Sequence, residues 1–483
     1  MKISEIIYRD EYIFSCVEEN VEIDKITTRP SEADEKTLVI IPNSKNISEA
    51  DFEENMPAAV ICDTDANIPA GIPTIRVENP RRALSYAYHR FEEIDLKDII
   101  LIGVTGTNGK TTTTTFIKKI LEHSGYKVGF IGTGKIEIAN ECISVSDYSM
   151  TTPDPSLLYP TLKKMALSGC NAIVMEVSSH SLALEKVAPL KFDYGIFTNL
   201  SREHTDFHKD IEDYFLAKSK LFSQCKKSFF NVDDDYARLA YKECQSKKVS
   251  VGAIWDADIC GRNIENLGLC GSKFTYHWDN YSCKIRLNVA GIYNVYNSML
   301  ASAVCIDIGC KPRDVKEALA EITSLPGRFE IIKDEITVII DYAHTENAFY
   351  NIMKELNSLK GSNRLSVVFG CGGERDKSKR PRMAQIAEKF ADEITVTQDN
   401  SRKENPKDII CDIIRGFDRK SYYVCEDRAE AIERAIIEAK RGDIVAVIGK
   451  GAEKYNIDKN GYQEFDEKKI IATALEKRKA RRK

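Results

Sequence analysis

The sequence predicts an α/β protein built from several domains, and three observations support this fold class. The chain has 483 residues, which is enough for two to four domains of ordinary size. Short apolar segments alternate with helical segments, which is the pattern of parallel sheets covered by helices on both faces. A glycine-rich loop follows one of these apolar segments and leads directly into a helix, as it does in doubly wound folds.

Composition excludes several classes of protein. The chain is 43% apolar and 30% charged, so each domain can bury a core and remain soluble. Lys and Arg number 69 and Asp and Glu number 74, so the net charge is −5, which argues against a protein that mainly binds nucleic acid. The 14 cysteines form no Cys-x-x-Cys pair, so we expect neither a zinc ribbon nor disulfides. Without a signal sequence or an apolar stretch of about 20 residues, we expect a cytoplasmic protein with no membrane insertion.

The first unit, residues 1–97, is predicted to be a small α/β domain. The segment ENPRRALSYAYHRFEE (78–93) is predicted to form a helix, because Pro80 stands near its start and an apolar stripe runs along it. Three short apolar or β-branched segments, bounded by Pro, Asn or Asp, are typical of strands: residues 37–42, 58–63 and 74–77.

The second unit, residues 98–326, is predicted to contain a mainly parallel sheet. It opens with the apolar run DIILIGV (98–104), which suits a buried strand, and the glycine loop and a helix follow. Gly125 is expected to end that helix. Residues 249–287 are β-rich and polar, and we expect a hairpin insertion there. Further strands are predicted between helical segments, at residues 172–177, 194–200 and 227–234.

The third unit, residues 327–483, again shows the doubly wound pattern. Its final residues, EKRKARRK, are basic, and we interpret them as the solvated, frayed end of a helix rather than as a tail that binds nucleic acid. Strands are predicted at residues 337–343, 365–370, 393–397 and 443–449.

The loop GVTGTNGKTT (103–112) indicates a site for a nucleoside triphosphate. Glycines allow the backbone to turn tightly and to point N–H groups at phosphate oxygens, and the start of the following helix adds a positive dipole end. Lys110 can reach the terminal phosphates, and the Thr111 hydroxyl is placed to bind Mg²⁺. Val104 stands where the common phosphate loop has a glycine, and Gly106 supplies the turn instead. The alternative, a glycine turn that happens to contain lysine, is disfavoured because strand, loop and helix occur in the required order.

The segment GTNGKTT (106–112) resembles the signature of the Mur ligases, the ATP-dependent amide-forming enzymes of peptidoglycan assembly. The chain looks like the MurE type, the UDP-N-acetylmuramoyl-tripeptide synthetases, with a divergent N-terminal domain. The remaining motifs stand in the family's order: TTPDP (151–155), MEVSSH (175–180), TNLSREHTDFH (198–208), YFLAKSKLF (214–222), GIYNVYN (291–297), GRFE (327–330), DYAHTENA (341–348), FGCGGERDKSKRP (369–381) and DNSRKENP (399–406).

The resemblance implies both an architecture and a reaction. Residues 1–97 would bind the UDP-MurNAc-peptide, residues 98–326 would form a central ATPase domain, and residues 327–483 would form a Rossmann-like domain that binds the amino acid. ATP would phosphorylate the free carboxylate of UDP-MurNAc-L-Ala-D-Glu, and an incoming amine would attack the acyl phosphate, releasing ADP and phosphate. ATP and Mg²⁺ are the implied cofactors, peptidoglycan synthesis is the implied process, and we expect a monomer.

The same resemblance assigns the nucleotide and metal residues. Lys110, Glu176, His204 and Lys218 would be catalytic, and Thr111, Glu176, His204 and carbamylated Lys218 would hold Mg²⁺, which prefers oxygen ligands. On their own, Glu176 would be interpreted as a capping or ion-paired acid and His204 as a surface histidine. The nucleotide-binding residues would be Gly106, Thr107, Asn108, Gly109, Lys110, Thr111, Thr112, Asn294, Asn297, Arg328, Asp341 and His344.

The substrate residues follow in the same way. Arg402 would grip the far carboxylate of meso-diaminopimelate and Glu453 its far ammonium, which favours diaminopimelate over lysine. A surface arginine in a polar loop is the alternative interpretation of Arg402. The dipeptide residues would be Thr28, Thr151, Thr152, Ser178 and Lys186, and the amino-acid residues Arg375, Asp399, Asn400, Ser401, Arg402, Gly449 and Glu453.

The departures from the family pattern concentrate on the acceptor side. Leu184 and Lys186 stand where the family has glutamine and arginine, Ser401 replaces a proline, and the first domain is the most eroded. A paralogue that ligates an amino acid to a different carboxylate acceptor is therefore an alternative. A folylpolyglutamate synthetase-like ligase would lack TTPDP and EVSSH. A degenerate nucleotide-binding regulator would have lost Lys110, Glu176 or Lys218, and all three are present.

Overall fold

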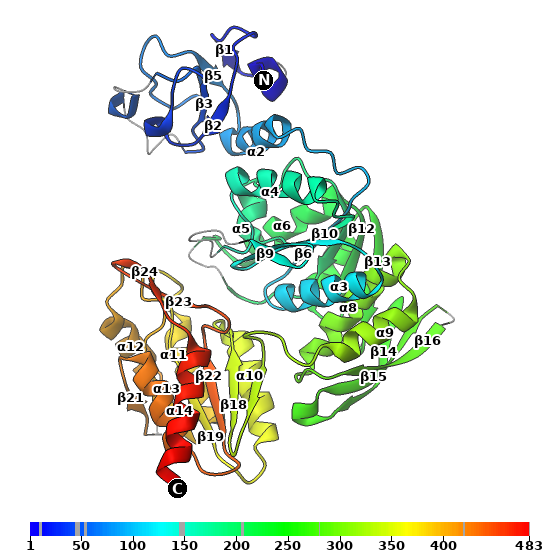
Figure 1. Cartoon of the computed structure of the whole chain (residues 1–483), viewed down its shortest axis with the longest axis vertical. Helices are drawn as coiled ribbons and strands as arrows, with labels where there is room; N and C mark the ends of the chain where they lie inside the picture. The colour runs from blue at the N-terminus through cyan, green and yellow to red at the C-terminus, as the bar shows by residue number, and fades with distance from the viewer. Residues whose placement is uncertain are drawn as a thin grey trace.

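The structure of the chain, a computed structural model, describes residues 1–8, 12–43, 49–52, 56–143, 150–203, 207–279, 281–418 and 421–482. Within the described residues, three large sheets follow one another along the chain, helices pack against each of them, and β23 and β24 form a further two-stranded antiparallel sheet (Figure 1). The first sheet lies at one end of the molecule, and the third lies beside the second (Figure 1). The predicted α/β class is confirmed.

The N-terminal sheet has the strand order β1-β5-β4-β3-β2. Its strands are parallel except β1, and the parallel strands are joined by crossover segments rather than by tight hairpin turns. The Asn79 side chain accepts a hydrogen bond from the Arg82 backbone and so caps α2, which packs against α4 of the next part of the chain. The elements are α1 (Ile3–Ile6), β1 (Phe14–Ser15), β2 (Lys25–Thr27), β3 (Thr37–Ile40), β4 (Ala59–Cys62), β5 (Thr74–Arg76), α2 (Pro80–Phe91) and the short 3-10 helices Pro30–Glu32 and Glu49–Phe52.

The central sheet has eleven strands in the order β16-β15-β14-β13-β12-β11-β6-β10-β7-β8-β9. Strands from β14 to β7 pair in parallel, and antiparallel hairpins extend both edges. The strands are β6 (Ile100–Thr105), β7 (Val128–Gly132), β8 (Lys135–Ile138), β9 (Glu141–Ile143), β10 (Ala172–Glu176), β11 (Phe192–Phe197), β12 (Cys225–Asn231), β13 (Lys247–Gly252), β14 (Ile259–Asn266), β15 (Ser272–Trp278) and β16 (Tyr281–Leu287).

Helices cover both faces of the central sheet, and each face has its own apolar cluster. On one face α3 and α8 pack together beside α9. Gly125 ends α3 in the left-handed conformation, as predicted. The helices are α3 (Lys110–His123), α4 (Pro155–Leu167), α5 (Ser179–Ala183), α6 (Ile211–Ser219), α7 (Asp235–Glu243), α8 (Tyr293–Ile308), α9 (Pro312–Glu321) and the 3-10 helices Lys220–Gln224 and Gly268–Cys270.

One expectation for this region needs correction. Residues 249–287 are not a separate hairpin insertion, because β13 and β14 pair in parallel and continue the main sheet, and only β15 and β16 run antiparallel. The polar composition of this segment reflects its position at the sheet edge, where one face is open to solvent.

The C-terminal sheet has the order β17-β18-β22-β19-β20-β21, with only β17 antiparallel. Strand β22 is inserted between β18 and β19, so the chain reverses direction across the sheet beside β22. The elements are β17 (Glu330–Lys333), β18 (Thr337–Asp341), α10 (Glu346–Leu359), β19 (Leu365–Phe369), α11 (Lys379–Phe390), β20 (Glu393–Val396), α12 (Pro406–Ile414), β21 (Tyr423–Val424), α13 (Arg428–Glu438), β22 (Ile444–Ile448), β23 (Tyr455–Asp458), β24 (Gly461–Glu464) and α14 (Glu467–Arg482).

The basic C-terminal segment was predicted to be a solvated helix end, and this prediction is wrong for Arg478. Helix α14 packs along α13 (Figure 1). Arg478 is only 3% exposed, and its guanidinium donates to the carbonyls of Ile436, Ile437 and Ala439 at the end of α13. A cation at a helix C-terminus satisfies the carbonyls that lack partners within the helix, so a basic residue has a buried role here.

No helix within the described ranges is both long enough and apolar enough to cross a lipid bilayer.

Candidate active site

A cavity of about 670 Å³ lies between the central sheet and the C-terminal sheet. Glu176 ends β10 and Thr133 follows β7 on one side, while Asp341 ends β18 and Gly449 follows β22 on the other. All are at the carboxyl ends of parallel strands, the edge at which open α/β sheets bind their ligands. The strand order within each sheet brings distant motifs to one edge, and the two edges face each other across the cavity.

Two glycines shape the phosphate loop between β6 and α3. Gly106 has φ +144° and Gly109 has φ +86°, both in the region that favours glycine. A Cβ atom on Gly106 would lie 1.9 Å from the Thr198 hydroxyl oxygen, and one on Gly109 would lie 2.5 Å from the Asn297 amide oxygen. The loop therefore requires glycine for both backbone conformation and space.

The residues that follow β11 hold the loop in place. The Thr198 hydroxyl donates to the Asn108 carbonyl at 2.6 Å, and the Asn108 N–H donates to the Asn199 side chain at 3.0 Å. The Thr107 and Tyr214 hydroxyl oxygens lie 3.2 Å apart. These contacts explain why the TNLSREH motif accompanies the glycine loop.

Lys110 lines the cavity, and its ammonium donates to the carbonyls of Gly106 and Thr107, each at 2.8 Å. Burial lowers the pKa of Lys110, while the Glu176 and Glu203 carboxylates act in the opposite direction. The cation lies at the centre of the loop, where it can neutralise phosphate charge.

Lys218 is only 1% exposed although it is on a helix that begins at the surface. Its amine donates to the Gly106 carbonyl at 2.8 Å and lies 4.5 Å from the centre of the Tyr214 ring. Burial, aided by the nearby Lys110 cation, holds the pKa of Lys218 well below its usual value. Such a site favours the neutral amine, which is the form that reacts with CO₂.

Glu176 has a setting that suits a divalent cation. Its side chain is fully buried, and its two oxygens accept hydrogen bonds from the Thr133 N–H at 3.1 Å and the Thr133 hydroxyl at 3.2 Å. Within the described ranges it forms no ion pair with Lys, Arg or His. A buried carboxylate at a cavity wall without a paired cation fits Mg²⁺, with the Thr111 hydroxyl and Lys218 on the same cavity. Thr133 was not predicted, because the strand before it was not recognised in the sequence.

Two contacts join the central part to the C-terminal part across the cavity. The Arg328 guanidinium donates to the Thr111 hydroxyl at 3.2 Å and lies 4.2 Å from the centre of the Tyr342 ring. His344 Nε2 lies 3.1 Å from a Glu203 carboxylate oxygen. Glu203, which also lines the cavity, was missed, although it lies within the TNLSREH motif.

Asp341 and the two asparagines of α8 differ in their access to the cavity. Asp341 accepts hydrogen bonds from the N–H groups of Phe329 (2.6 Å) and Ala343 (2.8 Å), and burial raises its pKa. Asn297 lines the cavity. Asn294 does not, because its amide donates to the Ala290 carbonyl at 2.6 Å and its oxygen accepts from Asn297 at 3.3 Å.

Part of the cavity wall is a group of mostly charged residues that we call the amine pocket: Arg375, Asp399, Asn400, Arg402, Gly449 and Glu453. Lys450 does not line the cavity but lies 3.6 Å from both carboxylates of this pocket. Lys450 is fully buried, and its ammonium donates to the Asn400 side-chain oxygen at 2.6 Å and to the Tyr455 carbonyl at 2.9 Å. The Asn400 amide nitrogen then donates to Glu453 at 2.8 Å. Lys450 was not predicted, although it stands in the same GKGAE segment as Gly449 and Glu453.

Ser401 does not line the cavity, but hydrogen bonds fix the position of the loop in which it lies. The Arg402 N–H donates to the Ile457 carbonyl at 3.0 Å, and the Gly373 N–H donates to the Asn400 carbonyl at 2.9 Å. The Arg402 guanidinium donates to the Gly373 carbonyl at 2.8 Å. Hydrogen bonds therefore restrain this loop in place of the proline that the family pattern has there.

Asp399 supplies a prediction about acid stability. Burial alone would raise its pKa, but the Lys450 and Arg428 cations lower the pKa of Asp399 from 3.8 to about 2. A carboxyl group with a depressed folded-state pKa stabilises the protein above its unfolded-state pKa, and this contribution is lost as the pH falls through the folded-state value. At about 1.4 kcal/mol per pKa unit, we expect Asp399 to contribute about 2 kcal/mol to the free energy of unfolding above pH ~4. This contribution is lost between pH ~4 and ~2.

Thermal unfolding of the protein and of Asp399→Asn at several pH values measures this contribution. The variant is expected to unfold roughly 5 °C lower at pH 7, with a difference that narrows as the pH approaches 2. A difference that stays constant from pH 7 to pH 2 would contradict the assignment.

At the opposite wall lie the residues predicted for the acceptor. The Thr152 hydroxyl donates to the Glu176 carbonyl at 2.9 Å, and Ser178 caps α5. Lys186 pairs with Asp154 at 2.6 Å. Thr151, Thr152, Ser178 and Lys186 line the cavity, and so does Leu184.

The structure thus brings most of the predicted residues together. Gly106, Asn294, Ser401 and Thr28 are described but do not line the cavity. Thr28 is exposed beside β2 of the N-terminal sheet. His204 lies outside the described residues.

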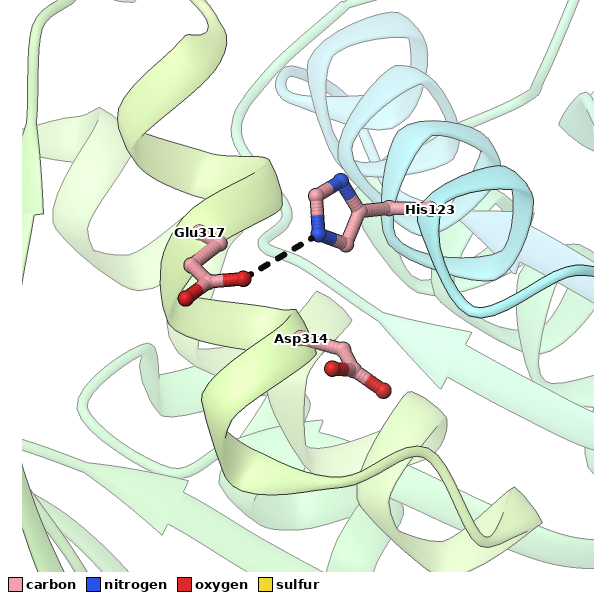
Figure 2. A group of neighbouring side chains, drawn as sticks. All are labelled: His123, Asp314 and Glu317. Atoms are coloured by element: carbon pink, nitrogen blue, oxygen red, sulfur yellow. Dashed lines mark ion pairs between the residues drawn. The ribbon is translucent and has the colours of Figure 1, made fainter.

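A second group of potential metal ligands lies elsewhere, where His123 at the end of α3 faces Asp314 and Glu317 of α9 (Figure 2). His123 lies 3.5 Å from Glu317 and 3.6 Å from Glu321, and Glu317 also accepts a hydrogen bond from Arg313 at 2.8 Å. The charge of Glu317 is therefore already balanced. We interpret the group as a surface ion-pair network that joins α3 to α9.

Comparisons with known proteins agree with this geometry. Residues 104–305 match the model of the Mur ligase middle domain, and residues 327–451 match that of the Mur ligase, glutamate ligase domain. The chain is 37% identical to UDP-N-acetylmuramoyl-L-alanyl-D-glutamate–2,6-diaminopimelate ligase 1 of Clostridium acetobutylicum, over 98% of each chain. It is 39% identical to UDP-N-acetylmuramoyl-L-alanyl-D-glutamate–2,6-diaminopimelate ligase of Caldanaerobacter subterraneus subsp. tengcongensis, over 87% of each chain. A solved structure of a UDP-N-acetylmuramoyl-L-alanyl-D-glutamate–2,6-diaminopimelate ligase superposes with a TM-score of 0.69 and 26% identity, over 99% of each chain.

Proposed function

Because the chain belongs to the Mur ligase family, we propose that it is an ATP-dependent, ADP-forming ligase that adds meso-diaminopimelate to UDP-MurNAc-L-Ala-D-Glu in peptidoglycan synthesis. The observation that supports this most directly is the single cavity that contains both the phosphate loop and the amine pocket. A ligase that joins a phosphorylated carboxylate to an amine needs both sites in reach of each other.

We assign the work to three parts of the chain. Residues 1–97 would bind the UDP end of the acceptor, residues 98–326 would bind ATP, and residues 327–483 would bind the amino acid. We further propose that the enzyme works as a monomer in the cytoplasm. The contacts of Arg328 with Thr111 and of His344 with Glu203 would then be made and broken as the parts close around the substrates.

The first chemical step places the γ-phosphate of ATP against the acceptor carboxylate. Two anions must approach each other, so the step needs positive charge and alignment. Lys110 supplies a cation at the loop, and the N–H groups at the start of α3 orient the phosphates. Thr111, Glu176, His204 and carbamylated Lys218 would hold Mg²⁺, which when bound neutralises phosphate charge and aligns the oxygens.

The second step is attack of an amine on the acyl phosphate. The amine pocket contains two carboxylates, Asp399 and Glu453, and the two arginines Arg375 and Arg402. Diaminopimelate carries a carboxylate and an ammonium at each end. The carboxylate at its far end can pair with the arginines, and the ammonium at that end can pair with the carboxylates of the pocket. Lysine offers no far carboxylate for the arginines, and this is why we favour diaminopimelate.

Arg402 tests the choice of amino acid. Arg402→Met is expected to raise the KM for diaminopimelate by about 100-fold, because a partly buried charge partner of the substrate is removed. The KM for ATP should stay within about twofold, since the phosphate loop is untouched. Arg415→Met is the matched control, because the Arg415 side chain is 75% exposed and pairs with Asp412 in the same part of the chain. Equal effects of the two variants would contradict the assignment.

A different carboxylate acceptor is the second candidate. The Leu184 side chain cannot form hydrogen bonds and lies on the acceptor wall, and Lys186 is already paired with Asp154 at 2.6 Å. A lysine in place of arginine also lacks the fork that grips a carboxylate at two points. This favours an acceptor with fewer polar groups at that position.

An ADP-release assay decides between the two candidates. UDP-MurNAc-L-Ala-D-Glu is supplied with ATP, Mg²⁺ and one of diaminopimelate, lysine or ornithine. Release with diaminopimelate and little with the other two supports the favoured function. If folded, ATP-binding protein releases no ADP with any of the three, the favoured function is rejected and a different acceptor is supported.

A further inference from the structure

Arg428 is a buried arginine that lies directly behind the amine pocket. It is the first residue of α13 and only 1% exposed. Its guanidinium makes three hydrogen bonds, to Glu467 at 2.6 Å, to the Ile448 carbonyl at 3.0 Å and to the Gln398 carbonyl at 3.3 Å. A buried guanidinium needs partners of this kind, because an unpaired charge in the interior is costly.

The two carbonyls belong to the strand ends that carry the pocket residues. Ile448 ends β22 and is followed by Gly449, while Gln398 lies just after β20 and is followed by Asp399. Strands β20 and β22 are not neighbours, because β19 lies between them. The two strands are linked only through β19, whose Phe369 pairs with Val396 on one side and with Ile448 on the other. Beyond these last paired residues, Arg428 joins the two chain segments directly.

Asp399, Gly449 and Arg428 lie close together at this bridge. A Cβ atom on Gly449 would lie 2.6 Å from an Asp399 carboxylate oxygen and 3.8 Å from an Arg428 nitrogen. A shift of the guanidinium would therefore move Asp399 or the Gly449 backbone. The charge of Arg428 also helps to keep Asp399 ionised.

Glu467 connects this bridge to the end of the chain. It is the first residue of α14, its side chain is 1% exposed, and it balances the charge of Arg428. The helix thus reaches the pocket at one end, while Arg478 attaches α14 to the opposite end of α13, away from the pocket.

We propose that Arg428 is a positioning residue for the amine pocket and that, through Glu467, the C-terminal helix α14 takes part in binding the incoming amino acid. This rests on the proposed function, because the pocket is taken to bind the diamino acid. Arg428 touches no substrate itself. It sets where Asp399 and Gly449 stand.

Steady-state kinetics of four variants test this proposal. Arg428→Met breaks a buried ion pair and can fail to fold, so the double variant Arg428→Met with Glu467→Met replaces the pair by apolar side chains, a change that proteins often tolerate. Arg428→Lys keeps the positive charge but loses the planar guanidinium, which donates to Glu467 and to both carbonyls at once. Arg478→Met is the matched control, because it removes another buried arginine that joins α13 to α14 but lies away from the pocket.

The double variant is expected to raise the KM for diaminopimelate by about 10- to 100-fold, with the KM for ATP within about twofold, because small displacements of binding groups have effects of this size. Arg428→Lys should recover part of the loss, and Arg478→Met should leave both KM values unchanged. Hydrogen exchange of residues 398–402 and 448–453 should quicken most in the double variant, less in Arg428→Lys and not in Arg478→Met.

Three outcomes would overturn the role of Arg428. These are an unchanged KM for diaminopimelate in the folded double variant, an equal rise in Arg478→Met, or a parallel rise in the KM for ATP. The parent protein is measured first. If it ligates no diamino acid, the proposed function is wrong; if it does and the variants behave as above, only the role of Arg428 is wrong.

Discussion

Replacing Lys218 by alanine is expected to lower turnover by at least about 10³-fold, and Lys218→Arg is expected to be equally inactive. The amine is buried against the Gly106 carbonyl at 2.8 Å, and a carbamate formed on it would supply the anionic oxygen that Mg²⁺ prefers. Arginine keeps a positive charge at all relevant pH values and cannot take the place of a carbamate. Initial rates of ADP release, at saturating ATP, measure the loss.

The neighbouring Lys220 provides the control. Its side chain is 49% exposed and pairs with Glu185, so Lys220→Ala should retain almost full activity. The parent enzyme should also lose activity in buffer depleted of CO₂ and regain it with bicarbonate, whereas Lys218→Ala should not respond. An active Lys218→Arg enzyme would refute the role of a carbamate.

Gly106→Ala is expected to weaken ATP binding by at least about 100-fold and to reduce turnover accordingly. The backbone at Gly106 has φ +144°, and the added Cβ would lie 1.9 Å from the Thr198 hydroxyl and 3.0 Å from the Asn199 carbonyl. Thr198 donates to the Asn108 carbonyl at 2.6 Å, so moving it would also disturb the loop backbone. Isothermal titration with a non-hydrolysable ATP analogue measures the affinity directly.

Gly125→Ala separates backbone strain from loss of the site. Gly125 also has a positive φ, +90°, but apart from its chain neighbours no described residue has an atom within 4 Å of the position of its Cβ. This variant should lose about 1 kcal/mol of stability and keep its affinity for ATP. If Gly106→Ala binds ATP as tightly as Gly125→Ala does, the claim that a Cβ at Gly106 disturbs ATP binding is wrong.

The elements with strong local signals could be predicted from the sequence. The run before the glycine loop is β6, the following helix ends at His123, two residues before Gly125, and Pro80 begins α2 after Asn79. In each case the signal is a residue whose own conformational preference matches the element. Most predicted strands run one to three residues past the last paired residue, whereas β11 and β12 begin two residues before their predicted starts. The ends of a strand depend on its pairing partners, which the local sequence does not specify.

The residues that were missed have no local signal of this kind. Thr133 follows a short strand and becomes notable only because its backbone and hydroxyl both donate to Glu176, 43 residues later. Lys450 and Arg428 look like surface cations in the sequence, and their buried partners come from other loops. The basic C-terminal segment was misjudged for the same reason, since Arg478 finds its carbonyl partners on α13.

The sequence alone therefore determined the fold class, the phosphate loop and, through its motifs, the family resemblance, because these depend on residues that are near neighbours in the chain. The tertiary structure decided which side chains share the cavity. That outcome depends on the strand order within the C-terminal sheet, which brings the ends of β18, β20 and β22 to one edge, and on the packing of this edge against the central sheet, where β10 ends. It also decided the burial of Lys218, Arg428 and Lys450, since burial is a property of what packs around a residue and is not contained in its own segment.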